Sequence, residues 1–123
     1  MLFRSNIHNV GSMAVDNIFK YKKRDLKDIS KDFNFDFSNP FCLITYHSCT
    51  LGEDPYRGII GILSALKKLK NINFVFTYPN PDNGGQVIID EINKFVDNHP
   101  NTSVFIKNFG QLNYFSKIGR AHV

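Results

Sequence analysis

Apolar residues along this chain form short runs that alternate with stretches of helical spacing. The runs are rich in β-prone residues and are bounded by turn formers, which is typical of buried strands. They cover residues 41–46, 73–78 and 103–107. Between them, apolar side chains recur every three or four residues over 55–70 and from Val87 to about Pro100, as on one face of a helix. The pattern predicts the order strand, helix, strand, helix, strand.

Strands that alternate with helices of this length are joined by right-handed crossovers and pair in a parallel sheet. We therefore expect an α/β fold built on a Rossmann-like parallel βαβαβ sheet. Three lysines are expected in the last turn of the first helix, where cations favour the helix dipole, and Asn71 is a plausible stop. These lysines are Lys67, Lys68 and Lys70.

Two further segments flank the predicted sheet. Before Pro40, a short motif over residues 9–17 is followed by a charged helix at about 22–33, which together look like a connection arriving from a preceding domain. After the third strand, residues 110–115 begin another predicted helix. The sheet is therefore expected to be the centre of the domain.

The two ends of the chain read as foreign to the rest. Residues 1–5 are what a common sequencing adapter encodes when read from a GTG start. Residues 118–123 are what the reverse complement of that adapter encodes before a stop codon. Because both ends match the adapter, we expect residues 6 to about 117 to be a segment cut from a longer gene. Such scars carry no information on the fold and are left out of its prediction. The alternative is that both ends are native.

Composition and charge limit the class of protein. The chain has 123 residues, 42% hydrophobic and 14% aromatic, enough for one domain with a packed core. Its net charge of +4 falls to +2 without Arg4 and Arg120 of the end segments, which gives no reason to expect a nucleic-acid partner. No apolar run of about 18 residues and no signal-peptide pattern is present, so we expect no membrane association. The two cysteines, Cys42 and Cys49, indicate reduced thiols in a cytoplasmic protein.

Polar residues follow each predicted strand, at the edge where parallel sheets bind ligands. His47 follows the first strand, residues 79–85 the second and residues 108–111 the third. A histidine there can donate to a phosphate or titrate near neutral pH, and the alternative is a structural histidine at a strand end. In the loop over 80–85, backbone amides and glycines suit an anion. The loop matches neither a Walker nor a dinucleotide motif, and an ordinary turn is the alternative.

Cys42, His47 and Cys49 do not form a metal-binding pattern. Cys42 falls within the first predicted strand, a second pair of ligands is missing, and the spacing fits no standard zinc module. Nothing in the sequence orients a Cys–His nucleophile. We therefore expect no metal site at these residues, and no other cofactor is expected.

Several of these segments, in this order, resemble the UDP-N-acetylglucosamine 2-epimerase family. The first strand with its histidine resembles the opening strand of the family's C-terminal lobe, and the other segments resemble motifs around it. The segments are residues 9–12 with Asp16, 41–47, 76–82, 99–101 and 110–114. The similarity covers nearly all of residues 6–117 and is closest to the hydrolysing branch, which makes N-acetylmannosamine for sialic and related nonulosonic acids.

The resemblance implies a glycosyltransferase-B-type fold, in which two Rossmann-like lobes hold the substrate between them. Residues 6–39 would then be the interlobe connection with its helix, and residues 40–117 part of the C-terminal, UDP-binding lobe. Residues 1–5 and 118–123 are the adapter-derived ends. The implied partner is a UDP-sugar, and the parent protein is expected to be a homo-oligomer.

The resemblance also assigns roles to individual residues. In the hydrolysing branch, UDP leaves by elimination across C1 and C2, and water then adds to the glycal. By position, His47 matches the histidine that contacts the UDP diphosphate and assists its departure, a reasonable task for an imidazole. Asn80 matches an asparagine that binds the nucleotide. Phe109 sits where the family contacts uracil, partly through its backbone, and Tyr114 is placed to stack nearby.

This sequence departs from the family in two respects. Residues 48–50 are Ser-Cys-Thr, where related enzymes often have arginines or a proline, which leaves the branch open. The family's catalytic carboxylates belong to the N-terminal lobe, before Asn6, and its phosphate-binding turn lies after Lys117. We therefore expect the isolated chain to be marginally stable and inactive, with an unpaired strand edge near residues 103–107.

Three other interpretations stay open. The parent enzyme can be a non-hydrolysing 2-epimerase that returns UDP-N-acetylmannosamine for surface polysaccharides. Within the hydrolysing branch, the substrate can be a diacetamido sugar. The chain can also be a non-catalytic, stand-alone module of flavodoxin-like or nucleotide-binding type.

Overall fold

The computed structural model describes residues 8–20, 24–47, 54–80, 84–110 and 113. Its centre is a three-stranded sheet of β1 (Phe41–Thr45), β2 (Asn73–Thr77) and β3 (Ser103–Ile106), in the order β1-β2-β3. Both pairings are parallel. The predicted parallel βαβαβ sheet is confirmed. The predicted helix at 110–115 and the side chains of Cys49 and Tyr114 fall mostly or wholly outside the described residues.

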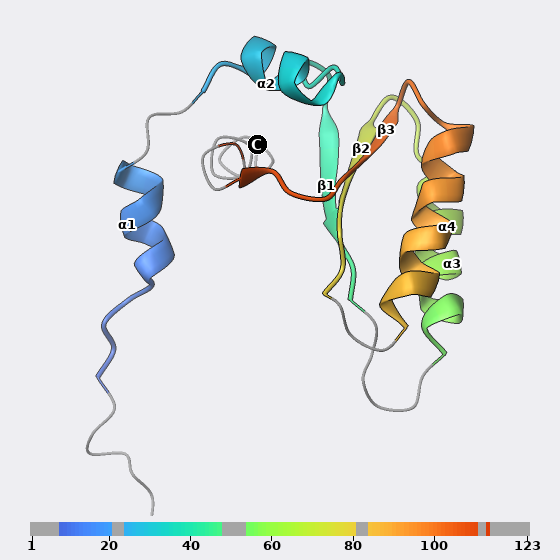
Figure 1. Ribbon diagram of the computed structural model, residues 1–123, viewed down its shortest axis with the longest axis horizontal. Helices are drawn as coiled ribbons and strands as arrows, with labels where there is room; N and C mark the ends of the chain where they lie inside the picture. Colours follow the sequence, from blue (N-terminus) through green and yellow to red (C-terminus); the bar gives the residue numbers. More distant parts are fainter. Residues whose placement is uncertain (1–7, 21–23, 48–53, 81–83, 111–112, 114–123) are drawn as a thin grey trace, which may run out of the picture.

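Helices α3 (Pro55–Leu66) and α4 (Gly85–Asn98) cover one face of the sheet (Figure 1). They lie on the same face because two right-handed crossovers that step in the same direction place their helices on the same side. Their buried side chains pack against alternate residues of β2, Phe74 and Phe76. The members of this first cluster are Ile59, Leu63, Phe74, Phe76, Ile88, Ile92 and Phe95.

The opposite face is covered by α2 (Leu26–Phe33) and the chain that follows it (Figure 1). Asp25 caps α2 by accepting from the backbone N–H of Lys27, and Asn34 ends it in the left-handed conformation at φ 48°. The second cluster is made of Ile29, Phe35, Phe37, Val75, Ile106 and Phe109. The predicted charged helix is thus confirmed, and it shields the sheet.

One prediction on α3 was wrong. The helix ends at Leu66, so Lys67, Lys68 and Lys70 lie beyond its last turn. The chain tightens at this point, because the N–H groups of residues 68 and 69 bond to carbonyls only three residues back. Asn71 then takes a positive φ of 60°, which turns the chain into β2. The turn that leads into β2 at Asn73 therefore ends the helix earlier than the spacing of its apolar side chains suggests.

Helix α1 (Met13–Lys20) was not predicted as a helix, and it lies apart from the sheet (Figure 1). Phe19 is 84% exposed and Val15 is exposed as well.

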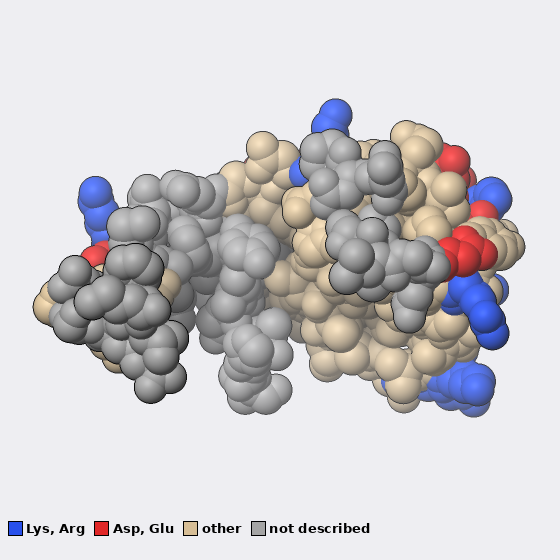
Figure 2. All heavy atoms as spheres, turned by 90° about the horizontal axis from the view of Figure 1, so that it is seen from below, with Lys and Arg blue, Asp and Glu red and all other residues tan. Residues whose placement is uncertain are grey.

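None of the helices in the described ranges has both the length and the apolar character needed to cross a lipid bilayer. On the face drawn in Figure 2, Lys and Arg side chains stand at several separate places, and at one end Asp and Glu side chains stand among them.

Candidate functional site

A hollow of about 390 Å³ lies at the carboxyl ends of the three strands. Its floor includes Thr45 of β1 and Thr77 of β2, which are partners in register and whose hydroxyl groups hydrogen-bond at 2.6 Å. Ile106 of β3 pairs with Thr77 and continues the same row. Because residues in register share a face of the sheet, the hollow opens on the side away from α3 and α4.

His47 stands on one side of this hollow and is tied to the next loop. The backbone N–H of Asn80 donates to His47 Nδ1 at 3.1 Å. A neutral imidazole carries its proton on one nitrogen only, so this bond assigns the proton to Nε2. The side chain is exposed, and both residues line the hollow. His47 is therefore oriented as a hydrogen-bond donor through Nε2.

The loop that carries Asn80 is packed closely against the start of α4. A Cβ atom built on Gly85 would lie 3.0 Å from the Asn80 carbonyl oxygen, which is tighter than nearly all real contacts. Gly84 precedes the helix at φ 87°, a conformation that glycine adopts at little cost. Within the described residues, the first turn of α4 holds no acidic side chain.

Residues 107–110, which follow β3, form a further wall of the hollow, after His47 and the loop that carries Asn80; we call it the third wall. Lys107, Asn108, Phe109 and Gly110 line the hollow, and the Gly110 N–H donates to Asn108 Oδ1 at 2.8 Å. The Phe109 side chain is only 6% exposed, because its ring is packed into the second cluster. A ligand at this wall meets mainly Lys107, Asn108 and Gly110, which are exposed, because Phe109 is almost wholly buried.

Lys107 places a positive charge beside the hollow. Its Nζ lies 6.0 Å from the centre of the Tyr78 ring, which itself stacks on Phe105 at 4.2 Å between ring centroids. A cation over an aromatic face is held weakly but directionally. Together with the Nε2–H of His47, this ammonium makes the hollow suited to an anionic ligand.

The structure brings three of the four predicted site residues together. His47, Asn80 and Phe109 line the same hollow, whereas Tyr114 lies outside the described residues. The hollow is also lined by Thr45, Thr77 and Lys107, which were not predicted as site residues. Their position at the ends of the predicted strands was a signal that points to this edge of the sheet.

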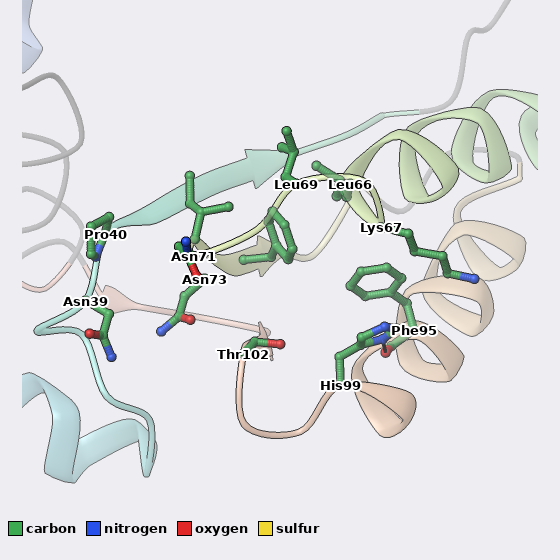
Figure 3. Close-up of a pocket in the computed structure, with 12 residues that line it drawn as sticks. Asn39, Pro40, Leu66, Lys67, Leu69, Asn71, Asn73, Phe95, His99 and Thr102 are labelled. Carbon is green, nitrogen blue, oxygen red and sulfur yellow. Dashed lines mark hydrogen bonds between the residues drawn. The ribbon is translucent and has the colours of Figure 1, made fainter.

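A larger hollow, of about 630 Å³, lies at the opposite edge of the sheet (Figure 3). It surrounds Asn73 at the start of β2, and His99, whose ring stacks on Phe95, stands beside it. Parallel sheets of this type bind ligands at the carboxyl ends of their strands, so size alone does not make this hollow the site. Within the described part of the chain, no group of three or more His, Cys, Asp or Glu side chains could hold a metal ion.

Comparison with known families identifies the family of this chain. A family model described as UDP-N-acetylglucosamine 2-epimerase matches residues 2–123. The chain belongs to the UDP-N-acetylglucosamine 2-epimerase family.

Two curated proteins that are named as 2-epimerases are similar to the chain. One, the GDP/UDP-N,N'-diacetylbacillosamine 2-epimerase (hydrolyzing) of Campylobacter jejuni, is 28% identical over 120 residues, or 95% of this chain and 31% of that protein. The other, the UDP-N,N'-diacetylbacillosamine 2-epimerase (hydrolyzing) of Legionella pneumophila, is 26% identical over 98 residues, or 80% of this chain and 26% of that protein. The chain thus spans less than a third of the length of either 2-epimerase.

Proposed function

We propose that this chain supplies the UDP-binding part of a hydrolysing UDP-sugar 2-epimerase. The single observation that carries the proposal is the hydrogen bond from the Asn80 backbone to His47 Nδ1, at the ligand-binding edge of a parallel sheet. It presents the Nε2–H of His47 to the hollow. Both similar relatives carry the word hydrolyzing in their names, which favours that branch.

In the proposed complex, the diphosphate of the UDP-sugar lies in the hollow, beside His47 and the loop that carries Asn80. The Nε2–H of His47 donates to a phosphate oxygen and stabilises the negative charge that grows as UDP leaves. Lys107, on the third wall, adds a second positive group at the same hollow. The uracil faces the backbone beside Phe109, and the side chain of Asn80 contacts the nucleotide.

The proposed reaction begins with loss of UDP across C1 and C2 of the sugar. The C1–O bond breaks with its electron pair going to UDP, the proton on C2 goes to a base, and a glycal forms. Water then adds across the double bond, with hydroxyl at C1 and a proton at C2 on the opposite face. The products are UDP and the free 2-epimeric sugar. The base belongs to the N-terminal lobe in this family, and we propose that the chain alone is inactive.

Two sugars are candidates for the substrate. UDP-N-acetylglucosamine would yield N-acetylmannosamine for sialic or related nonulosonic acids. UDP-N,N'-diacetylbacillosamine is favoured by the names of both relatives. The non-hydrolysing reaction, which would return UDP-N-acetylmannosamine, is the second candidate function, because residues 48–50 differ from the usual sequence after this histidine.

Proton NMR of the reaction mixture tests the proposal. A full-length protein that contains this segment is incubated in turn with each of the two UDP-sugars. Free 2-epimeric sugar together with UDP is the expected result. Accumulation of UDP-N-acetylmannosamine would move the protein to the non-hydrolysing branch, and no reaction with either sugar would contradict the proposed function.

A further inference from the structure

Helix α2 reaches the wall of the ligand hollow although it precedes the whole sheet in sequence. Phe33, the last residue of α2, lies edge-on against Phe109, with ring centroids 5.2 Å apart and an interplanar angle of 60°. Edge-to-face aromatic pairs contribute directional energy beyond the area that they bury. The ring that anchors residues 107–110 is therefore held by α2 as well as by the sheet.

A polar contact joins the same two parts of the chain. Arg24 Nη1 donates to Asn113 Oδ1 at 2.6 Å and to Asp32 Oδ2, also at 2.6 Å. Asp32 lies on α2, so the guanidinium bridges this helix and the chain that follows the third wall. The planar guanidinium fixes the direction of both bonds. The side chains of Arg24 and Asp32 are 29% and 44% exposed, so this ion pair adds little to stability and acts mainly on position.

We propose that α2 is a positioning element of the nucleotide-binding hollow, and that Phe33 and Arg24 set where residues 107–110 stand against the ligand. The nature of this ligand, a uridine diphosphate, rests on the proposed function. Neither Phe33 nor Arg24 lines the hollow. They act through Phe109 and Asn113, and a small displacement of a ligand-binding wall weakens binding strongly.

The coupling must also act in the opposite direction. If the position of α2 alters the affinity for UDP, then UDP alters the stability of α2 by the same free energy. Binding of UDP is therefore expected to slow hydrogen exchange of the α2 amides, including that of Ile29, although α2 does not contact the ligand.

The test compares two phenylalanines of the second cluster. Phe33 and Phe41 are both partly buried against it, but Phe41 lies at the amino end of β1, where its ring contacts Phe37. In a ¹⁵N-labelled full-length protein that contains this segment, Phe33→Leu is expected to shift the amide resonances of residues 107–110 and to weaken UDP binding about tenfold by calorimetry. Phe41→Leu, the matched control, is expected to leave both unchanged, and Phe33→Tyr is expected to retain binding.

A variant outside the core covers the case in which Phe33→Leu does not fold. Arg24→Gln is expected to weaken UDP binding about threefold and to shift the amide of Asn113. Equal effects of the two leucine variants on the amides of 107–110, or an unchanged UDP affinity in both Phe33→Leu and Arg24→Gln, would overturn the proposal. If the unsubstituted full-length protein does not bind UDP, the proposed function fails, and the amide shifts alone decide whether α2 positions the wall.

Discussion

The backbone N–H of Asn80 donates to His47 Nδ1 at 3.1 Å and so joins the loops that follow β1 and β2. The bond uses the main chain of Asn80, which leaves its side chain available for the proposed contact with the nucleotide. It also fixes the imidazole tautomer, so that a single hydrogen bond decides which nitrogen of His47 can donate to a ligand.

His47→Asn separates the two roles of the imidazole. The asparagine amide can still accept from the Asn80 N–H but has no donor at the position of Nε2. In a full-length protein that contains this segment, turnover measured by proton NMR is expected to fall about 100-fold or more, with little change in melting temperature. The matched control is His99→Asn at the opposite edge of the sheet, which should keep normal turnover. Normal turnover in His47→Asn would assign His47 a structural role.

Gly85→Ala tests whether close packing of the Asn80 loop against α4 maintains the hydrogen bond from the Asn80 N–H to His47 Nδ1. The new methyl group would lie 3.0 Å from the Asn80 carbonyl oxygen, so the Asn80 backbone must shift. The bond to His47 Nδ1 should weaken, and the ¹⁵N resonances of the ring should show a mixture of tautomers. Gln86→Ala, at the exposed next position, is the control. Ring resonances identical to those of the unsubstituted chain would show that the added methyl group is accommodated without a shift of Asn80.

Gly58→Ala is expected to destabilise the fold by about 1–3 kcal/mol, although alanine favours a helix more than glycine does. A Cβ atom built on Gly58 would overlap the Tyr46 hydroxyl group, whereas one built on Gly61 of the same helix meets nothing within 4 Å. Gly61→Ala should therefore be neutral or stabilising by up to about 1 kcal/mol in urea unfolding. Tyr46→Phe should recover part of the loss in Gly58→Ala, and failure to do so would place its origin elsewhere.

Asp36 gives the stability a defined dependence on pH. The hydroxyl and the backbone N–H of Ser38 both donate to its carboxylate, and these bonds lower the pKa of Asp36 from its ordinary value of 3.8, the hydroxyl having the larger effect. A carboxylate with a lowered pKa in the folded state stabilises the fold above its ordinary pKa, and this contribution disappears as the pH falls through the folded value. Thermal melts of Asp36→Asn should thus differ from the unsubstituted chain at pH 6 and converge with it near pH 2. A difference independent of pH would contradict this origin.

The strands could be predicted from the sequence because burial on both faces leaves a clear mark. Four successive residues of β2, from Asn73 to Phe76, are buried, and such an unbroken run can hardly be anything but a central strand. The crossovers then fix which ends of the strands meet, so the neighbourhood of His47 and Asn80 followed from topology alone.

Contacts between distant segments could not be predicted in the same way. Periodicity assigns Phe33 to an apolar position of a helix but does not say that it meets Phe109, because nothing local encodes a partner so far along the chain. Helix α1 was missed for a related reason, since its exposed Val15 and Phe19 make no core in this chain. The end of α3 at Leu66 was set by the turn into β2. The lysines after Leu66 gave no sign of this turn, because lysines are also favoured in the last turn of a helix.

The two hydrophobic clusters also differ in how far apart their members lie along the chain. The first joins α3, β2 and α4, which follow one another directly, whereas the second must bring residues before β1 against residues after β3. Closing that long loop costs more entropy and slows the contact. The side of the sheet that carries the hollow is therefore expected to assemble last during folding, and hydrogen exchange should find it the first to open in the native protein.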